Sequence, residues 1–428
     1  MNKREVVITG TGLTSPLGRT VSENWTNMKA LKTGIGHYPK DGIPVFEYMG
    51  KIAEISIPKD IPQKILGQMK FLNRGAILGF LSAYEAINQT HYNPADIPLD
   101  RRSLYVASGD FTKVGYDFLY PSLQDASGSY LTEIDFEKLN GSALSKVNPF
   151  FLLESLSNNL FSFLSAFLEF MGPNSSLASL SPCGGYAIEL ACRSIRQNKA
   201  DIAVAVGYCN WITEVPLYEI DGLGIVSKCR DGLSSFRPFD RKRDGFITGE
   251  GGAALVLEAA DTAEKRGAAI LGRIRGTGNC IEFTSGTGFT VPPMVSRRCM
   301  EIAMDDAGCG FHDLAFITPH GSGTQKGDAS ELMSLKRVCE ENKVSIPVSG
   351  MKAYTGHLGA ASDIAEVIMG ISAVRDKIVP ATLNFSEPDK AFRDLKIFGS
   401  HQATDKTCFL STSYGVGGQS SSVVAEVF

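Results

Sequence analysis

The sequence predicts a layered α/β protein with two similar halves, and two observations carry this prediction. Short apolar runs recur along the chain, and stretches with helical periodicity lie between them. Such alternation is typical of a sheet that is covered by helices. The apolar runs that we expect to be strands are residues 6–9, 104–107, 202–206, 253–257, 314–317, 347–349 and 423–428.

The second observation is a weak internal repeat. Residues 8–12 read Ile-Thr-Gly-Thr-Gly, and residues 274–278 read Ile-Arg-Gly-Thr-Gly after the charged, helix-like stretch 261–266. The natural join lies near Glu258, where an apolar strand gives way to that charged stretch. We therefore expect an N-terminal half over residues 1–258 and a C-terminal half over residues 259–428.

The composition is that of a globular protein with a large core, since 43% of the 428 residues are hydrophobic and 21% are charged. The net charge is −4 and both signs are well mixed, which gives no support for a nucleic-acid partner or a polybasic membrane surface. The first apolar run, Val6 to Ile8, is too short for a secretion signal or a membrane-spanning helix. We expect a cytoplasmic protein.

Nine cysteines are scattered along the chain without a CxxC pair or a His/Cys ligand spacing. This pattern argues against a disulfide framework and against a metal site. Most of these cysteines, such as Cys192, Cys209 and Cys408, lie in apolar runs where cysteine behaves as a small hydrophobic residue.

The segment 148–171 is dense in Phe and Leu. Its apolar content is too wide for one face of an exposed helix, so we expect it to be buried or to face another subunit. An ordinary core helix and a subunit interface are equally good explanations at this point.

Cys183 is a candidate nucleophile. It follows Ser181 and Pro182 and precedes two glycines and the helical stretch 186–197, so it lies at a predicted helix N-terminus. Free backbone N–H groups and the helix dipole there favour a thiolate and lower the cysteine pKa. The two glycines would leave the thiol unobstructed. Taken alone, a cysteine at such a turn is more often structural.

Two histidines strengthen the catalytic reading, because each lies in a glycine-rich loop rather than on an apolar face. His320 follows the predicted strand 314–317, and His357 follows Lys352 by five residues. Either histidine alone could be a buried, hydrogen-bonded core residue. Together with an activated thiol, they form a site suited to thioester transfer.

Several motifs now add up to a resemblance. They are Val-Val-Ile-Thr-Gly-Thr-Gly at 6–12, Gly-Pro-Asn at 172–174, Arg-Pro-Phe-Asp-Arg-Lys-Arg-Asp-Gly-Phe at 237–246, His-Gly-Ser-Gly-Thr at 320–324 with Gly327, Asp328 and Glu331, Lys352 with Gly356-His357, and Ser-Tyr-Gly-Val-Gly-Gly at 413–418. In this order and spacing, nearly end to end, they resemble the β-ketoacyl-acyl-carrier-protein synthases, in particular the elongating Cys-His-His branch. The resemblance implies a thiolase-like fold, with two βαβαβαββ halves stacked in five α-β-α-β-α layers.

The resemblance also implies the chemistry, a decarboxylative Claisen condensation of a malonyl thioester with an acyl group held on Cys183. His320 and His357 would hold and polarise the malonyl carbonyl, with Lys352 and Glu331 orienting them. Enolate formation needs such donors in a dry site. The remaining implied roles are an oxyanion hole from the backbone N–H groups of Cys183 and Tyr414, phosphopantetheine contacts from Ser322 and Thr324, and a gating loop of Tyr414, Gly415, Val416, Gly417 and Gly418.

This chain departs from the family pattern at the Ser-Pro-Cys-Gly-Gly surroundings of the nucleophile, at Gly323 where Ser is usual, and at Tyr414-Gly415-Val416 in place of a Phe-Gly-Phe gate. Pro182 stiffens the approach to the thiol, and Tyr414 brings a hydroxyl to a gate that is usually apolar. These changes favour a ketosynthase of a type II polyketide or polyene system over a housekeeping fatty-acid enzyme.

Two other functions are compatible with the fold. One is a non-catalytic partner subunit similar to a chain-length factor, which the presence of Cys183 disfavours. The other is a coenzyme A-dependent acyltransferase, which the paired histidine loops disfavour. The resemblance implies an acyl carrier protein as partner, a homodimer or a heterodimer with a chain-length-factor-like subunit, and no cofactor beyond the phosphopantetheine that carries the substrates. Candidate basic residues for the acidic carrier protein are Lys64, Lys70, Arg74 and Lys146.

Overall fold

The structure is a computed structural model that describes residues 4–39, 46–109, 116–127, 133–283 and 291–428. Within these residues, eleven strands form one large sheet. They are β1 (Val6–Thr14), β4 (Arg102–Ser108), β5 (Asn174–Ala178), β6 (Ile202–Asn210), β7 (Glu250–Ala259), β8 (Gly272–Ile281), β9 (Leu314–Thr318), β10 (Pro347–Val348), β12 (Lys396–Ile397), β14 (Cys408–Tyr414) and β15 (Gln419–Val427).

The large sheet consists of two halves that meet at its centre. The strand order is β12-β10-β9-β14-β15-β8-β1-β7-β6-β4-β5, so β1 and β8 lie side by side in the middle. These two strands pair only at Val7 with Arg273 and at Ile8 with Gly272. Small two-stranded pairs lie outside this sheet, formed by β2 (Ile35–His37) with β3 (Tyr48–Gly50) and by β11 (Ile378–Val379) with β13 (Gln402–Ala403).

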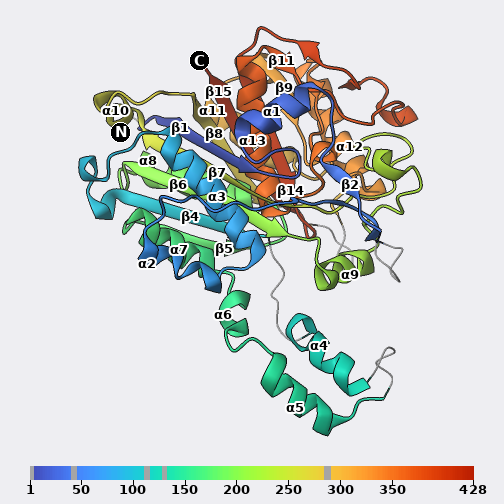
Figure 1. The fold of residues 1–428 in the computed structure, drawn as a ribbon. Coiled ribbons are helices and arrows are strands. Elements are labelled where there is room, and N and C mark those ends of the chain that lie inside the picture. The colour runs from blue at the N-terminus through green and yellow to red at the C-terminus, as the bar shows by residue number, and fades with distance from the viewer. Residues whose placement is uncertain (1–3, 40–45, 110–115, 128–132, 284–290) are drawn as a thin grey trace.

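Helices cover the half-sheets in layers, as Figure 1 shows. α8 (Cys183–Arg196) and α13 (Ala360–Arg375) pack against each other and against strands of both halves, which makes them the central layer. α3 (Arg74–Gln89) and α7 (Asn159–Leu168) cover the outer face of the first half. α11 (Arg297–Ala307) and α12 (Gln325–Asn342) cover the outer face of the second half. This is the five-layer thiolase-like arrangement that the resemblance implied, so the fold prediction is confirmed.

The burial of α13 follows from its sequence. Ala360 to Val374 are all buried, and the sequence between them is apolar around most of the helix. A helix that is apolar all round belongs inside the protein. The few polar side chains that it carries, among them Asp363 and Glu366, are therefore placed in the interior.

All seven predicted strands coincide with observed strands, although β1, β4, β6, β7 and β15 are each longer than expected by two or more residues. Four strands of the large sheet were missed, β5, β8, β12 and β14, and so were the strands of the two small pairs, β2, β3, β11 and β13. β5 is short and polar, and β8 alternates small or apolar residues with polar ones at the junction of the halves. The proposed division near Glu258 stays a prediction.

The internal repeat has a structural explanation. Residues 8–12 lie in β1, which continues beyond Gly12 to Thr14, and residues 274–278 lie in β8. A Cβ at Gly10 would lie 2.2 Å from the Ala86 oxygen of α3, and a Cβ at Gly276 would lie 2.2 Å from the Ala303 oxygen of α11. The glycines recur because an outer helix approaches each central strand at the same place.

The segment 148–171 divides into two parts. α7 buries Leu160, Phe163, Leu164 and Leu168 in the outer core of the first half, as expected for a core helix. α6 (Phe151–Ser155) belongs instead to an arm, formed with α4 (Tyr116–Ser127) and α5 (Phe136–Lys146), that projects away from the layers (Figure 1). The remaining helices are α1 (Val21–Lys29), α2 (Gln63–Leu66), α9 (Glu214–Gly222) and α10 (Ala260–Lys265).

Candidate active site

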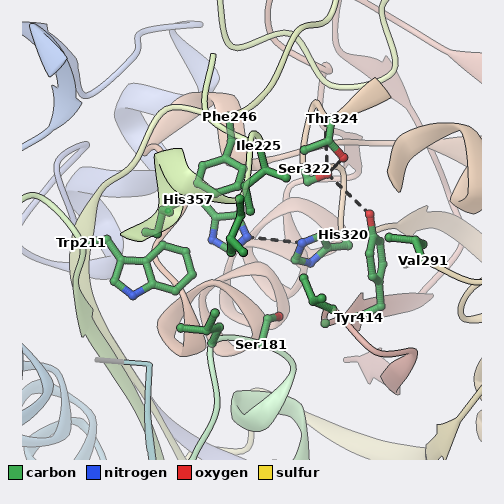
Figure 2. Close-up of a pocket in the computed structure, with 15 residues that line it drawn as sticks. Ser181, Trp211, Ile225, Phe246, Val291, His320, Ser322, Thr324, His357 and Tyr414 are labelled. Carbon is green, nitrogen blue, oxygen red and sulfur yellow. Dashed lines mark hydrogen bonds between the residues drawn. The ribbon is translucent and has the colours of Figure 1, made fainter. Parts of the chain in front are cut away.

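A cavity of about 90 Å³ lies beside the residues that follow β9 and end β14. Figure 2 shows His320, Ser322, Thr324 and Tyr414 on one side of it and His357 between Trp211 and Phe246 on the other. The apolar part of the lining is completed by Leu180, Ile220, Leu223, Ile225, Val291 and Val416. Polar groups therefore converge on one wall of an otherwise apolar pocket, which is typical of a ligand site.

The two predicted histidines face each other in this cavity. Their Nε2 atoms are 3.3 Å apart and their ring centroids are 5.0 Å apart. Burial lowers the pKa of both imidazoles well below the usual value, and the Lys352 charge lowers it further. Both histidines are therefore neutral at physiological pH, and each can donate from only one ring nitrogen.

The hydrogen bond at the far side of His357 fixes its tautomer. The backbone N–H of Gly359 donates to His357 Nδ1 at 3.1 Å. Because a backbone N–H can only donate, Nδ1 carries no proton and the hydrogen of the neutral ring is on Nε2. His357 therefore presents a fixed N–H donor to the cavity.

Glu331 holds the backbone of the His320 loop. Its carboxylate accepts the N–H of His320 at 2.6 Å and the N–H of Gly321 at 2.8 Å. Burial raises the pKa of Glu331 to about 8, although these two hydrogen bonds act to lower it. The predicted positioning role of Glu331 is thus compatible with its contacts.

Lys352 pairs with Glu366, a residue that sequence reasoning missed. The Lys352 ammonium lies 2.7 Å from Glu366 Oε1, and both side chains are buried. Burial raises the pKa of Glu366 to about 7, although Lys352 acts to lower it. The second oxygen, Oε2, has no hydrogen-bond partner among the described residues. Lys352 is thus held beside the histidines by a carboxylate from α13.

We predict that Lys352→Met destabilises the protein by about 3–5 kcal/mol at pH 8, because it leaves a buried carboxylate without its counter-charge. The folded-state pKa of Glu366, about 7, lies above the usual glutamate value of 4.5. The free energy of unfolding therefore falls as pH rises between these two values, and the variant steepens this fall. Urea denaturation at pH 5.5 and at pH 8 measures the free energy of unfolding of the variant and of the unmodified protein. Adding Glu366→Gln should recover most of the loss at pH 8, and a variant with no pH-dependent loss would contradict the pairing.

Cys183 begins α8 as predicted, but the predicted activation of its thiol by the helix terminus is wrong. The side chain is 1% exposed, and burial raises the pKa of the thiol well above its usual value, with the Asp363 charge adding to the effect. The N–H groups of Gly184 and Gly185 donate to Asp363 Oδ2 at 3.0 and 3.3 Å. These N–H groups are therefore already bound to a carboxylate, and although the backbone N–H groups of Cys183 and Gly184 act to lower the thiol pKa, burial outweighs them.

The two glycines after Cys183 also serve a different purpose from the one predicted. A Cβ at Gly184 would lie 2.2 Å from the Ala360 oxygen of α13, and a Cβ at Gly185 would lie 2.2 Å from Ser421 Oγ. Both glycines allow close packing of α8 against α13 and β15. They do not open space for a ligand.

Ser322, Thr324 and Tyr414 form a cluster of hydroxyl groups on the cavity wall. Ser322 Oγ lies 2.8 Å from Thr324 Oγ1 and 3.5 Å from the Tyr414 hydroxyl. The Tyr414 ring packs against His320, with ring centroids 4.5 Å apart. Hydroxyl groups here could bind a polar arm that ends beside the histidines.

The predicted gating loop forms the turn between β14 and β15. Gly417 and Gly418 adopt φ values of 98° and 86°, which favour glycine, and Val416 between the strands is 47% exposed. The backbone N–H of Gly415 donates to the backbone oxygen of Gln419. Because successive N–H groups along an antiparallel strand point to opposite sides, the N–H of Tyr414 points away from β15. On that side, the pairing of β14 with β9 ends earlier, at Ser411.

The four predicted carrier-protein residues have different surroundings. Arg74 is an unsuitable candidate, because its guanidinium is paired with the buried Glu250. Lys146 pairs with Asp125 in the arm, and Lys70 lies over the rings of Phe71 and Phe150. Lys64 lines a separate surface hollow beside α7. A fifth basic residue, Lys326, lines an outer hollow of about 390 Å³ that shares Leu223, Ile225, Val291, Thr324 and Val416 with the central cavity.

Four residues of the site were not predicted from the sequence: Asp363, Glu366, Ser413 and Trp211. Asp363 and Glu366 had one available signal, since two carboxylates interrupt the apolar sequence of a helix that follows His357. Their partners lie far away in the chain and gave no signal. Within the described ranges no cluster of three or more His, Cys, Asp or Glu side chains could hold a metal ion. No helix in those ranges is both long and apolar enough to cross a bilayer.

Comparisons with known proteins establish the family of the chain. Residues 3–263 match the family model described as Beta-ketoacyl synthase, N-terminal domain, and residues 273–386 match its C-terminal domain. A 3-oxoacyl-[acyl-carrier-protein] synthase 2 from Staphylococcus aureus is 29% identical over 430 residues, covering 100% of this chain and 99% of that protein.

Solved structures show the same fold. A β-ketoacyl synthase from Burkholderia phymatum superposes with a TM-score of 0.84 at 25% identity, covering 99% of this chain and 100% of that one. A ketosynthase structure described as a type II polyketide synthase acyl carrier protein in complex with its ketosynthase bound to the hexaketide gives a TM-score of 0.82 at 22% identity, covering 100% of both chains.

Proposed function

The chain belongs to the β-ketoacyl synthase family, and on this premise we propose that it is a 3-oxoacyl-[acyl-carrier-protein] synthase that extends an acyl chain held on Cys183. The observation that carries the proposal is the pair of neutral, buried histidines that face each other in an apolar cavity. A chain-length-factor-like role is not favoured, because Cys183, His320 and His357 are all present.

In the first half-reaction, Cys183 Sγ attacks the carbonyl of an acyl thioester. The bond from that carbonyl to the phosphopantetheine sulfur breaks, and the thiol proton ends on the leaving sulfur. Because the thiol pKa is raised, the proton must leave during the attack rather than before it. The backbone N–H groups of Cys183 and Tyr414 are proposed to stabilise the anionic oxygen.

In the second half-reaction, a malonyl thioester binds at the histidine wall, which is the part of the cavity lined by His320 and His357. The bond to its carboxylate breaks, carbon dioxide leaves, and the electron pair forms an enolate whose oxygen accepts a hydrogen bond from His357 Nε2–H. The enolate carbon then attacks the acyl-cysteine carbonyl, releasing the Cys183 sulfur, which takes up a proton. The product is a 3-oxoacyl thioester.

The substrates are proposed to arrive on the phosphopantetheine arm of an acyl carrier protein, entering past Lys326 and contacting Ser322 and Thr324. The proposal includes no metal or other cofactor, because imidazole and backbone N–H groups supply the donors that both anionic oxygens need. Lys64, Lys70 and Lys146 remain candidates for docking of an acidic carrier.

We propose that a second subunit adds to the sheet at β5. This strand ends the sheet and pairs only with β4 within the described part of the chain, so its outer edge presents unpaired backbone groups. The neighbouring arm exposes Phe136, Leu144 and Leu153. A homodimer and a heterodimer with a chain-length-factor-like subunit both fit, and the mass of the assembly in solution distinguishes them.

The acyl group is proposed to be a polyketide or polyene chain. Trp211 and Phe246 flank His357 with ring centroids 4.9 Å from it, and such flat faces suit a conjugated chain. The departures at Pro182, Tyr414 and Val416 support the same class.

The test is reconstitution of the full chain with malonyl carrier protein and a series of saturated and conjugated acyl carrier proteins. We expect a 3-oxoacyl carrier protein two carbons longer and, before malonyl is added, one acyl group on Cys183 by intact-protein mass spectrometry. Acylation from coenzyme A thioesters but not from carrier protein would support the acyltransferase alternative. No acylation from any donor, alone or with a copurified partner, would refute the proposal.

A further inference from the structure

Asp363 is a buried carboxylate between the nucleophile and the histidine wall, and the half-reactions above leave it without a role. It lies in α13 near the start of that helix and is 3% exposed. Four donors surround it: the N–H groups of Gly184 and Gly185, and the hydroxyl groups of Ser413 and Ser181 at 2.6 and 3.5 Å. Its contacts thus join α8, β14 and the loop that precedes Cys183.

The direction of these hydrogen bonds follows from the groups that can only donate. Oδ2 faces the two backbone N–H groups, so it is an acceptor. Burial raises the pKa of Asp363, whereas Ser413, the Lys352 charge and the two N–H groups act to lower it. In the carboxylate form of Asp363, Oδ1 carries no proton, so Ser413 must use its single proton to donate to Oδ1.

Ser413 carries this constraint to His320. Ser413 Oγ also lies 3.1 Å from His320 Nδ1 and 2.9 Å from Ser181 Oγ. Because the Ser413 proton points at Asp363, its oxygen is an acceptor toward His320, which must supply the hydrogen from Nδ1. The Nε2 atom of the neutral His320 ring is then a bare acceptor, and it faces the Nε2–H of His357 at 3.3 Å.

We propose that Asp363 is a positioning residue that acts through Ser413 to hold His320 in the tautomer with hydrogen on Nδ1, so that His320 Nε2 accepts a proton while His357 Nε2–H donates. The two histidines then have different tasks. Resting on the proposed function, the proton that His320 accepts is the one released when Cys183 is acylated, and it returns to the phosphopantetheine sulfur that leaves. A carboxylate that fixes an imidazole tautomer in this way is an established device in catalysis.

Asparagine at position 363 should reverse the chain of hydrogen bonds. Its carbonyl oxygen must occupy the Oδ2 site, because the two backbone N–H groups there can only donate. Its NH₂ group then faces Ser413 and donates to it. Ser413 turns its proton to His320 Nδ1, which moves the imidazole hydrogen to Nε2.

The experiment records the ring ¹⁵N signals of histidine in the full-length chain, for the unmodified protein and for Asp363→Asn, Ser413→Ala and Asp328→Asn. A His320→Asn variant assigns the His320 signals. Opposite tautomers are expected for His320 and His357 in the unmodified protein, and Asp363→Asn should convert His320 to the Nε2–H form. Asp328→Asn is the matched control, since Asp328 is also buried and accepts backbone N–H groups but contacts neither Ser413 nor His320.

A kinetic readout accompanies the spectra. Ser413→Ala removes the hydroxyl group that connects Asp363 to His320, while Asp363 still accepts the N–H groups of α8. It should slow acyl transfer to Cys183 by on the order of 10²-fold, the usual contribution of a proton acceptor. Circular dichroism and the Asp328→Asn spectra exclude general unfolding as the cause. Two equal Nε2–H tautomers in the unmodified protein, or a His320 signal unchanged by Asp363→Asn, would overturn the inference. Because the spectra need no substrate, they remain decisive even if the proposed condensation were not observed.

Discussion

Replacing Cys183 by alanine is expected to abolish self-acylation and condensation to below detection, while decarboxylation of malonyl carrier protein survives. The thiol is the proposed acyl acceptor, whereas carbon dioxide is lost at the histidine wall, which lies on other elements of the fold. Intact-protein mass spectrometry measures acylation, and release of carbon dioxide measures the malonyl half-reaction.

Cys192→Ala is the matched control for this variant. Cys192 lies in the same helix and is also buried, but it is inside the helix and not at its N-terminus, where Cys183 lies. It should retain acylation and condensation. Stoichiometric acylation of the Cys183→Ala variant would show that another residue is the nucleophile.

Replacing His357 by alanine is expected to lower decarboxylation and condensation together by on the order of 10²–10³, or about 3–4 kcal/mol, because it removes a fixed donor to the developing enolate. Self-acylation at Cys183 should remain measurable. His320→Ala should lower the same two rates, and it should slow acylation as well if His320 accepts the thiol proton. Rates of acylation and of carbon dioxide release for both variants measure these effects.

Iodoacetamide inactivation across pH tests the same assignment from the side of the thiol. Since burial raises the pKa of Cys183, alkylation of the unmodified protein should be slow at neutral pH and increase toward alkaline pH. Slow alkylation combined with normal decarboxylation in one histidine variant would make that residue the base of a Cys-His pair only. It would then have no part in holding the malonyl group.

Local patterns predicted the strands and the chemical residues well. His320 and His357 each lie in a glycine-rich loop after a short apolar run, and Cys183 precedes a stretch with helical periodicity; such units are defined within a few residues of sequence. Among the missed strands, β5, β8 and β14 are rich in Ser, Thr, Gly or Arg, and their strand character depends on their neighbours in the sheet. The prediction that Cys183 begins a helix was therefore correct, whereas the prediction that its thiol pKa is lowered was wrong.

What the sequence alone determined is the layered fold and the family resemblance, and it supplied the three residues proposed for the reactive centre. What only the tertiary structure decided is the state of those residues: a thiol whose pKa is raised, Lys352 paired with Glu366, and a carboxylate linked to His320 through Ser413. Asp363 stands 179 positions after Gly184, yet its oxygen lies 3.0 Å from that backbone nitrogen. Protonation states depend on burial and on charges within a few ångströms, and folding alone brings such distant groups together.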